Sequence, residues 1–455
     1  MATRYGKRIV TDGLVLCLDA ADNISAPHND LPVKQGLLAW WDAADDSTVT
    51  LSGSNVTQWR DKSGNSYHMS PSGTGPTRSN TQNSKSVLTF TAAQDIRDNS
   101  TDLNLTTTTH TVVVVSRYTT GNLLYTNNAG RILQGVSNNW LLGAWDSQPS
   151  KYYAAGWVTS SSRVSTNDTT WGIHTGTGDY SNDVWAYIKN GTDLTVSSGG
   201  GGGGPNRLSI NSGAINENSP CEVAELIVFN RVLSSDELTK VHNYLQNKWN
   251  IEVSDAKWYD RTANAYDGTP ANGPIYSETN KGYFDFDGTN DQIAIGNLGS
   301  FSTFTVEVLF KSDSVTNYKN IMDCNWLTDN ATYSNSGPRL EQYTSGSLAW
   351  VIGPGDGTYY GITIGSISSS QWVHAVITKT GTSSFVGYLN IPGTNASQNG
   401  SFTGWYGSLD DVVVGKGFNN SRYYDGKVAL VRIYNKALSS DEVLQNYNAT
   451  KGRYL

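Results

Sequence analysis

An all-β chain made of two β-sandwiches is the fold class that this sequence predicts, and three observations lead to it. The chain has 455 residues, which is long for one domain and enough for two that each bury a substantial core. Aromatic residues reach 11%, with 14 Trp and 25 Tyr, while charged residues make up only 16%. Glycine is abundant at 46 residues, a composition typical of short strands joined by polar turns. It excludes a coiled coil and argues against disorder.

Three pairs of similar segments divide the chain into two modules. The pairs are 13–22 (GLVLCLDAAD) with 36–45 (GLLAWWDAAD), 59–68 (WRDKSGNSYH) with 258–267 (WYDRTANAYD), and 229–238 (FNRVLSSDEL) with 434–443 (YNKALSSDEV). Along the chain, one copy of the first segment precedes all three segments of one module, and the two remaining segments come last. This order predicts an insertion into a surface loop, where insertions are tolerated best.

The predicted domains follow from this order. Residues 33–254 form an inserted sandwich A, and residues 1–32 together with 255–455 form sandwich B. The alternative is a tandem duplication with a stray extra copy of the first segment. It is ranked lower, because the extra copy would leave an apolar run without a sheet.

The local patterns predict corresponding elements in the two modules. Residues 110–116 (HTVVVVS) and 304–310 (FTVEVLF) are rich in β-branched and aromatic side chains, as expected for buried strands. A further strand at 185–188 enters a tight turn at Asn190-Gly191. Each module should end with one short helix, because Ser234 is followed by Glu237, and Ser439 by Glu442, in a capping-box pattern.

The net charge and the cysteines limit the possible partners. The formal net charge of −8 disfavours nucleic-acid binding, which needs a basic face. Cys17, Cys221 and Cys324 have no metal-ligand spacing, and Cys17 lies in an apolar run that predicts burial. The sequence shows neither the apolar segment of a signal peptide nor a membrane-spanning stretch, so we expect synthesis in the cytoplasm and no membrane insertion.

With these motifs in view, each module resembles the laminin-G-like, concanavalin A-like jelly rolls. The resemblance rests on the DAAD segments, the W-x-D-x-x-x-N block, FDGTND at 286–291 and VRIYNKALSSDEV at 431–443. Trp372-Val-His374 and Trp171-Gly-Ile-His174 are similar to a W-x-H strand of that group. The pattern looks most like copies in virion structural proteins of tailed bacteriophages. The implied fold is therefore two jelly rolls, one inserted into the other, each with a C-terminal helix.

Enzymatic activity is not expected. The paired carboxylates of jelly-roll glycoside hydrolases are missing, and Glu222 and Glu225 are predicted to lie on different faces of a strand. His174 and His374 occupy matching positions in the two modules and are interpreted as buried, hydrogen-bonded residues. No cofactor is expected except possible calcium, since that family sometimes binds calcium at the sandwich rim and Asp285, Asp287 and Asp291 lie close together. Ordinary turn formation is the favoured alternative for these aspartates.

Aromatic residues in loops are the remaining candidates for binding. Flat aromatic faces stack on sugar rings and also anchor protein interfaces. We select four as candidate glycan-binding residues: Trp145, Trp326, Tyr359 and Trp405. The alternative is that these four side chains fill the cores of their modules.

The predicted function is that of a non-enzymatic virion structural protein, a surface decoration or fibre-type component. Its expected partners are other capsid or tail proteins, further copies of itself on a particle, and host-surface glycans. The alternatives are a free carbohydrate-binding lectin and, third, a carbohydrate-active enzyme.

Overall fold

The computed structural model of the chain divides into two compact units. Unit 1 combines residues 1–28 with 257–455, and unit 2 is residues 29–256. The division falls within a few residues of the expected 32/33 and 254/255 boundaries. The structure describes residues 9–22, 25–26, 30–99, 103–120, 130–146, 148–162, 168–197, 202–215, 217–316, 318–324, 337–352, 360–381, 384–390, 395–399, 409–417 and 422–454.

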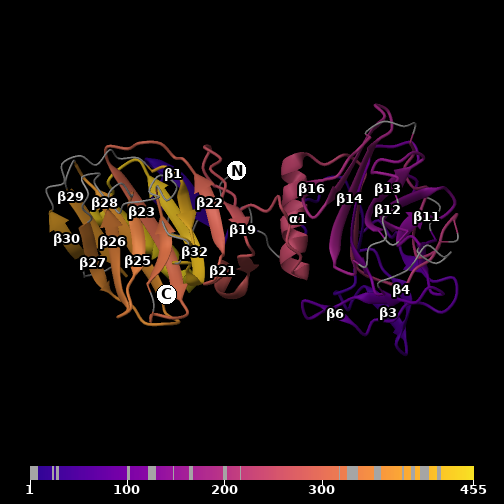
Figure 1. Cartoon of the computed structure of the whole chain (residues 1–455), viewed down its shortest axis with the longest axis horizontal. Helices are drawn as coiled ribbons and strands as arrows, with labels where there is room; N and C mark the ends of the chain where they lie inside the picture. The colour runs from indigo at the N-terminus through magenta and orange to yellow at the C-terminus, as the bar shows by residue number, and fades with distance from the viewer. Residues whose placement is uncertain are drawn as a thin grey trace. The chain divides into compact units, whose positions relative to one another are not determined.

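Unit 1 is built from two antiparallel sheets (Figure 1). The first contains, in spatial order, β20 (Ile275–Ser277), β21 (Tyr283–Asp287), β32 (Asp425–Tyr434), β23 (Phe304–Ser312), β28 (Trp372–Lys379), β29 (Ser384–Leu389) and β30 (Asn395–Asn399), with β1 (Leu14–Asp19) also on β32. The second contains β19 (Thr269–Ala271), β22 (Gln292–Gly296), β31 (Val412–Val414), β24 (Lys319–Asp323), β25 (Arg339–Gln342), β26 (Ser347–Ile352) and β27 (Tyr360–Ser366). A short 3-10 helix, Thr279–Lys281, precedes β21, and α2 (Ser440–Tyr454) ends the unit.

Unit 2 also consists of two antiparallel sheets, followed by α1 (Ser235–Trp249). The first contains β16 (Thr192–Asp193), β15 (Val184–Lys189), β14 (Gly172–Asp179), β10 (His110–Tyr118), β18 (Cys221–Phe229) and β2 (Leu37–Asp42), with β8 (Leu88–Phe90) also on β18. The second contains β13 (Gln148–Ala154), β12 (Trp140–Trp145), β11 (Leu133–Gly135), β17 (Leu208–Ile210), β9 (Ile96–Asp98), β5 (Met69–Ser70), β4 (Asn55–Trp59) and β3 (Val49–Ser52). The hairpin of β6 (Thr81–Gln82) and β7 (Lys85–Ser86) stands apart.

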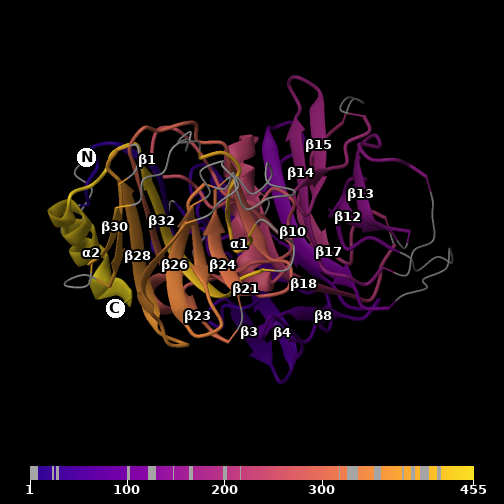
Figure 2. The same cartoon turned by 60° about the vertical axis from the view of Figure 1, so that its left-hand side comes forward.

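The main core of each unit lies between its two sheets, and a helix covers one outer face. In unit 2, Val112 and Val114 of β10 enter the inner core, whereas Val113 and Val115 face α1. Helix α1 packs the predicted apolar stripe of Leu238, Val241, Leu245 and Trp249 on that face. Figure 2 shows α2 beside the unit 1 sheet that contains β28 and β30.

Strand β1 belongs to unit 1 through its hydrogen-bonded neighbour. It pairs antiparallel with β32, where Cys17 lies opposite Arg432 and Asp19 opposite Leu430. Cys17 is buried, as expected, and burial raises the pKa of its thiol to about 11. Strand β1, which precedes unit 2 in the sequence, thus completes a sheet whose other strands all come after residue 256.

The W-x-D-x-x-x-N block of unit 2 explains how β2 is held. The carboxylate of Asp61 accepts hydrogen bonds from the Trp40 backbone N–H (2.9 Å), the Ser63 N–H (2.8 Å) and hydroxyl (2.7 Å), and the Tyr67 N–H (3.1 Å). The amide of Asn65 donates to the Leu38 carbonyl. One carboxylate therefore both shapes its own turn and fixes the neighbouring strand.

The same arrangement recurs in unit 1. Asp260 accepts from the Cys17 N–H (2.9 Å), the Thr262 N–H (3.0 Å) and hydroxyl (2.6 Å), and the Tyr266 N–H (3.1 Å). Asn264 donates to the Val15 carbonyl at 2.7 Å. Here the carboxylate joins two segments that are 243 residues apart in the sequence.

Both helices are capped and anchored in the same way. The predicted capping box is present at Ser234 and Glu237, and Ser439 and Glu442 exchange the equivalent hydrogen bonds. In the last turn, Lys248 contacts Asp42 of β2 at 2.7 Å, and Arg453 contacts Asp19 of β1 at 2.9 Å. The first aspartate of each DAAD segment therefore ties the first strand of its unit to the last helix.

Selective thiol labelling during unfolding tests which unit contains β1. We expect Cys17 and Cys324 to become reactive at the same denaturant concentration, because both are buried in unit 1, whereas Cys221 reports on unit 2. The measurement is mass spectrometry of alkylated peptides across a urea series. Exposure of Cys17 together with Cys221, ahead of Cys324, would contradict the assignment.

Removing the Asp260 carboxylate should destabilise unit 1 alone. Asp260→Ala leaves backbone N–H groups of two segments without their acceptor, which costs about 3 kcal/mol of unfolding free energy. The Cys17 and Cys324 transitions should move to lower urea, with Cys221 unchanged. Asp61→Ala is the matched control, and it should shift only the Cys221 transition.

Candidate functional site

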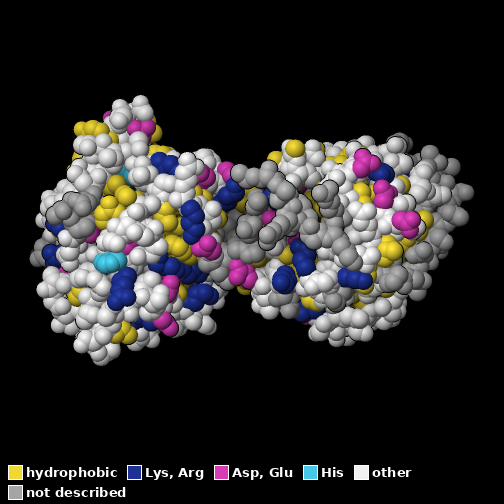
Figure 3. Space-filling view, turned by 180° about the vertical axis from the view of Figure 1, so that it is seen from behind, with side chains coloured by type: hydrophobic (Ala, Val, Ile, Leu, Met, Phe, Trp, Pro, Cys, Tyr) yellow, Lys and Arg dark blue, Asp and Glu magenta, His cyan; other side chains and the backbone are white. Residues whose placement is uncertain are grey.

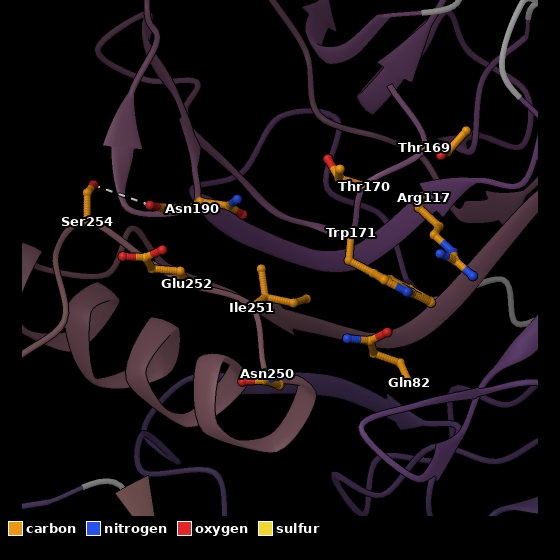
Figure 4. A pocket seen from close by; sticks show the side chains of 10 residues that line it. All are labelled: Gln82, Arg117, Thr169, Thr170, Trp171, Asn190, Asn250, Ile251, Glu252 and Ser254. Carbon is orange, nitrogen blue, oxygen red and sulfur yellow. Dashed lines mark hydrogen bonds between the residues drawn. The ribbon is translucent and has the colours of Figure 1, made fainter. Parts of the chain in front are cut away.

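An open pocket of about 810 Å³ lies in unit 2 beside the C-terminal end of α1 (Figure 4). Its lining comes from the β6–β7 hairpin, the end of β10, the segment before β14, the turn after β15 and the segment after α1. The lining residues are Gln82, Arg117, Thr169, Thr170, Trp171, Asn190, Asn250, Ile251, Glu252 and Ser254. We call it the Trp171 pocket. Its size falls in the usual range for ligand sites.

Trp171 and Arg117 form one end of this pocket. The Trp171 side chain is 8% exposed, and the guanidinium of Arg117 lies 5.0 Å from its ring centroid. Arg117 is held by the buried carboxylate of Glu222 at 2.7 Å, and a third of its own side chain remains exposed. Glu222 engages the Nε and Nη2 groups, which leaves other donors of the guanidinium for a ligand.

The segment after α1 forms the opposite side. Asn250 ends the helix in the left-handed conformation, with φ of 53°, and turns the chain across the sheet face. Beyond it, Ile251 is buried and Glu252 is exposed. Ser254 is fastened to the turn after β15, since its backbone N–H donates to the Asn190 carbonyl at 2.9 Å. The pocket rim is therefore fixed at both ends of this segment.

Unit 1 fills the corresponding position with aromatic rings. Backbone pairing aligns Trp372 with Trp171, because His374 and Asn390 exchange the same two hydrogen bonds as Ile173 and Asn190. Trp372 packs against Tyr454 at 4.9 Å and Tyr283 at 5.9 Å between ring centroids.

A second feature of unit 2 is a group of partly exposed aromatic rings, Trp145, Tyr153 and Trp157, which we call the Trp157 cluster. The ring centroids of Trp145 and Trp157 are 4.9 Å apart, and those of Tyr153 and Trp157 are 5.1 Å apart. Trp157 reaches this position because the chain reverses after β13 at Ala155, which has φ of 58°. None of the three rings belongs to the core between the sheets.

Charged groups hold the Trp157 cluster in place. The Trp145 indole N–H donates to Glu217 at 2.9 Å, and Arg131 bonds the same carboxylate oxygen at 2.8 Å. Lys151 lies 5.9 Å from the Trp157 ring centroid and donates to two backbone carbonyls. Burial lowers the pKa of Lys151. The rings are thus preorganised rather than loosely attached.

A smaller aromatic pair lies at the surface of unit 1. The rings of Tyr318 and Tyr343 are 5.3 Å apart, and the guanidinium of Arg422 lies 5.4 Å from the Tyr318 centroid. Arg422 bonds Glu341 at 2.8 Å. Tyr318 is 46% exposed.

Of the four predicted glycan-binding residues, Trp145 is the one that the structure describes. It lies at the end of β12 in the Trp157 cluster. Trp326, Tyr359 and Trp405 lie outside the described residues. Trp157 and Tyr153 are not among the predicted residues, because no sequence pattern indicates the chain reversal at Ala155 that brings them to Trp145.

The three aspartates of the calcium prediction have other partners. Asp285 pairs with Lys427 at 3.2 Å, and burial raises the pKa of its carboxyl group. Asp287 accepts from the Thr289 N–H, and Asp291 accepts from the Asp287 N–H, so both shape a turn. An ammonium group beside Asp285 does not fit a cation site. Among the described residues, no group of three His, Cys, Asp or Glu side chains could hold a metal.

The expected match between His174 and His374 is wrong. His374 bonds Glu307 at 2.6 Å on the face covered by α2, whereas His174 bonds Tyr187 at 2.8 Å inside the sandwich. Because Trp-Gly-Ile-His has one extra residue, Ile173 takes the position in unit 2 that His374 has in unit 1, and His174 points to the other face of its sheet. Both side chains are buried and hydrogen-bonded, as expected.

The expected separation of Glu222 and Glu225 onto different faces is also wrong. Glu225 bonds Tyr244 and Trp249 of α1, and Glu222 bonds Arg117, which covers Trp171 on the same outer face. The register of β10 with β18 shifts between Val115 and Ser116, so a bulge resets the alternation. Burial raises the pKa of Glu225 even though Lys248 opposes the shift.

One chain of hydrogen bonds has the order of a catalytic triad. His242 Nδ1 lies 2.8 Å from Asp255, and its Nε2 lies 2.9 Å from the Thr175 hydroxyl. Thr175 lies within β14 and has no exposed surface, so a substrate cannot reach its hydroxyl. This chain ties α1 and the segment after it to the sheet.

Comparison with known proteins places the concanavalin A-like fold in unit 1. Residues 287–444 match the family described as the concanavalin A-like lectin/glucanases superfamily. No curated protein matches the chain. The solved structures to which the chain is similar share low identity with it.

Three of these structures show the range. Domain 4 of AbnA, a GH43 extracellular arabinanase from Geobacillus stearothermophilus, in complex with arabinotriose, has 16% identity and a TM-score of 0.34, over 42% of this chain and 92% of that one. The receptor binding domain of botulinum neurotoxin mosaic serotype C/D has 15% identity and a TM-score of 0.34, over 42% and 48%. The SAP-like pentraxin from Limulus polyphemus has 18% identity and a TM-score of 0.28, over 36% and 80%.

The surface and the helices bear on the expected partners. On the face shown in Figure 3, each unit carries both basic and acidic side chains. Within the part of the chain that the structure describes, neither helix is long and apolar enough to span a membrane.

Two buried histidines predict an acid-sensitive unit 2. Burial lowers the pKa of His110 to about 4 and that of His174 to about 3. Both pKa values lie below 6.5, the pKa of an ordinary histidine such as one in the unfolded chain. As the pH falls, the unfolded state therefore binds protons first, and the stability that unit 2 has above pH 6.5 is lost as the pH falls toward 4. The Cys221 labelling transition should move to lower urea over this interval. In His110→Gln the dependence should decrease by about 1.4 kcal/mol per pH unit, and an unchanged slope would contradict the assignment.

Proposed function

We propose that this protein is a non-enzymatic glycan-binding protein and that the Trp157 cluster is its principal binding surface. The carrying observation is that Trp145, Tyr153 and Trp157 are partly exposed, close together and fixed by Glu217 and Lys151. Aromatic faces stack on the C–H groups of sugar rings, and rings that are already ordered lose little entropy on binding. Glu217, with 36% of its side chain exposed, supplies a carboxylate for sugar hydroxyls.

A second proposal concerns the organisation of the chain. We infer that unit 2 is an inserted copy of the same jelly roll as unit 1. The repeated aspartate arrangement at Asp61 and Asp260 and the repeated helix anchors at Lys248 and Arg453 support it. Deleting residues 33–254 and joining the ends with a short linker should leave a module that melts cooperatively. An insoluble or unfolded product would contradict this division of the chain into an inserted unit and a surrounding one.

The absence of enzymatic activity is also a proposal. Glu222 and Glu225 are buried and each is engaged in an ion pair, and the Thr175 hydroxyl is inaccessible. Hydrolysis of a polysaccharide by the purified protein, lost on changing a single carboxylate, would reverse this proposal.

We further propose that the protein is a virion component, a surface decoration or fibre-type protein present in several copies. The sequence resemblance of the DAAD opening to phage virion proteins motivates this placement. Purified particles should contain the chain at constant stoichiometry by mass spectrometry. A protein that binds glycans but never co-purifies with particles would instead be a free lectin.

A glycan array tests the Trp157 cluster directly. Wild-type protein should bind a defined set of glycans, and Trp157→Ala should weaken that binding about tenfold, equivalent to ~1.4 kcal/mol, because a stacking ring is lost. Tyr180→Ala is the matched control, since Tyr180 is an exposed aromatic residue of the same unit at the β14–β15 turn. Equal binding by all three proteins would contradict the assignment.

A further inference from the structure

We propose that the Trp171 pocket binds an extended peptide segment of a partner protein. In that segment an apolar residue lies over Trp171 and Ile251, with a basic residue toward Glu252 and an acidic residue toward Arg117. This site is separate from the proposed glycan surface and takes a different class of ligand.

The first argument is that the opening is particular to unit 2. In unit 1 the last helix supplies Tyr454, which packs on Trp372. The residue at the same place in α1 is Trp249, and its indole N–H turns away to bond Glu225 at 2.8 Å. The space beside Trp171 therefore stays open, although a strand and a helix in the corresponding positions surround it in both units.

The second argument is that the pocket does not suit a stacked sugar ring. Only 8% of Trp171 is exposed, and the Arg117 guanidinium already covers a face of its ring at 5.0 Å. An aromatic platform for a sugar needs a free face, such as those of the Trp157 cluster. What Trp171 and Ile251 offer instead is a narrow apolar floor for a single side chain.

The third argument is the mixture of donors and acceptors around that floor. Gln82, Asn190 and Asn250 carry carboxamide groups, and Thr169 and Thr170 carry hydroxyls. A peptide backbone offers an N–H donor and a C=O acceptor at each residue, which such groups can match. Within the chain, the Asn190 oxygen already accepts from the Ile173 N–H and the Thr170 hydroxyl donates to Asp168, so the other groups supply these contacts. Gln82 is already oriented, because its Nε2 donates to the Trp249 carbonyl at 2.8 Å and leaves its oxygen available as an acceptor.

The fourth argument is charge. Figure 4 shows Arg117 and Glu252 on opposite sides of Trp171 and Ile251. Glu252 is exposed, and Arg117 keeps a third of its side chain accessible. The pocket therefore has one basic and one acidic end, which complements a segment with two opposite charges. Trp and Arg are also enriched among the residues that dominate protein interfaces.

Selection from a displayed library of random nonapeptides, with the full chain as target, tests this proposal. Selected peptides should share an apolar residue between a basic and an acidic one. Thr170→Trp, at an exposed pocket residue, should weaken their binding at least tenfold by blocking the site. Thr57→Trp is the control, because Thr57 is exposed on β4 outside the lining and its replacement should change nothing.

Reversing one charge gives a sharper test. When the Glu252→Arg variant is the target of the same peptide selection, the basic residue of the consensus should be replaced by an acidic one. Destabilisation of the protein alone cannot produce this switch. An unchanged consensus, or no peptide that depends on the pocket, would overturn the proposal. So would loss of glycan binding in Thr170→Trp, because the pocket would then be a sugar site. Loss of glycan binding in Trp157→Ala alone concerns the proposed function and leaves the peptide site intact.

Discussion

The aspartate of the W-x-D-x-x-x-N block is the constraint on which the rest of each unit depends. A buried strand must find acceptors for its backbone N–H groups, and a single carboxylate provides them for the strand and for its own turn. In unit 2 the two partners, Asp61 and Trp40, are 21 residues apart, so the contact is nearly local. In unit 1, Asp260 and Cys17 are 243 residues apart. The same geometry thus closes a loop of ordinary length in one unit and gathers distant segments in the other.

The loop-closure cost explains why this is tolerable. The entropy lost in closing a loop grows only with the logarithm of its length, so a tenfold longer loop costs about 2 kcal/mol more. Asp19 adds to the compensation, because its carboxylate receives Arg453 from the last helix. The first strand of unit 1 is consequently held by a turn, a neighbouring strand and a helix together. None of these depends on the residues that lie between the two segments in the sequence.

Each unit has a buried carboxylate beneath its last helix, and different polar groups surround it in the two units. In unit 1, Glu307 is surrounded by His374, Arg432 and Asn446; burial would raise the pKa of Glu307, but Arg432 and His374 hold it below its usual value. In unit 2, burial dominates at Glu225 and its pKa is raised. A buried carboxylate is acceptable only when its hydrogen bonds are satisfied. The last helix supplies part of them in each unit, through Asn446 in unit 1 and Trp249 in unit 2. Each unit covers a sheet with its last helix, while the polar groups beneath that helix differ.

Much of the fold can be predicted from the sequence, because many of its elements depend on residues that are close together in the chain. The strands at 110–116 and 304–310, the Asn190-Gly191 turn and the Ser234 cap are all present, since each depends on neighbouring residues. The failures arise where one residue is added. A bulge resets the alternation before Glu225, and one extra residue turns His174 inward.

The binding features could not be read from the sequence for a related reason. Trp157 meets Trp145 only after a left-handed residue reverses the chain, and no aromatic spacing encodes that reversal. The Trp171 pocket depends on which way one large side chain turns. The Trp249 side chain could turn toward the buried carboxylate of Glu225 or fill the space beside Trp171. A buried indole N–H without an acceptor costs more than an unfilled apolar surface, so the Trp249 N–H goes to Glu225, where it joins the donors of Tyr244 and Lys248. The polar requirement of the core therefore opens the surface above it, and a site can arise there without any change in the fold.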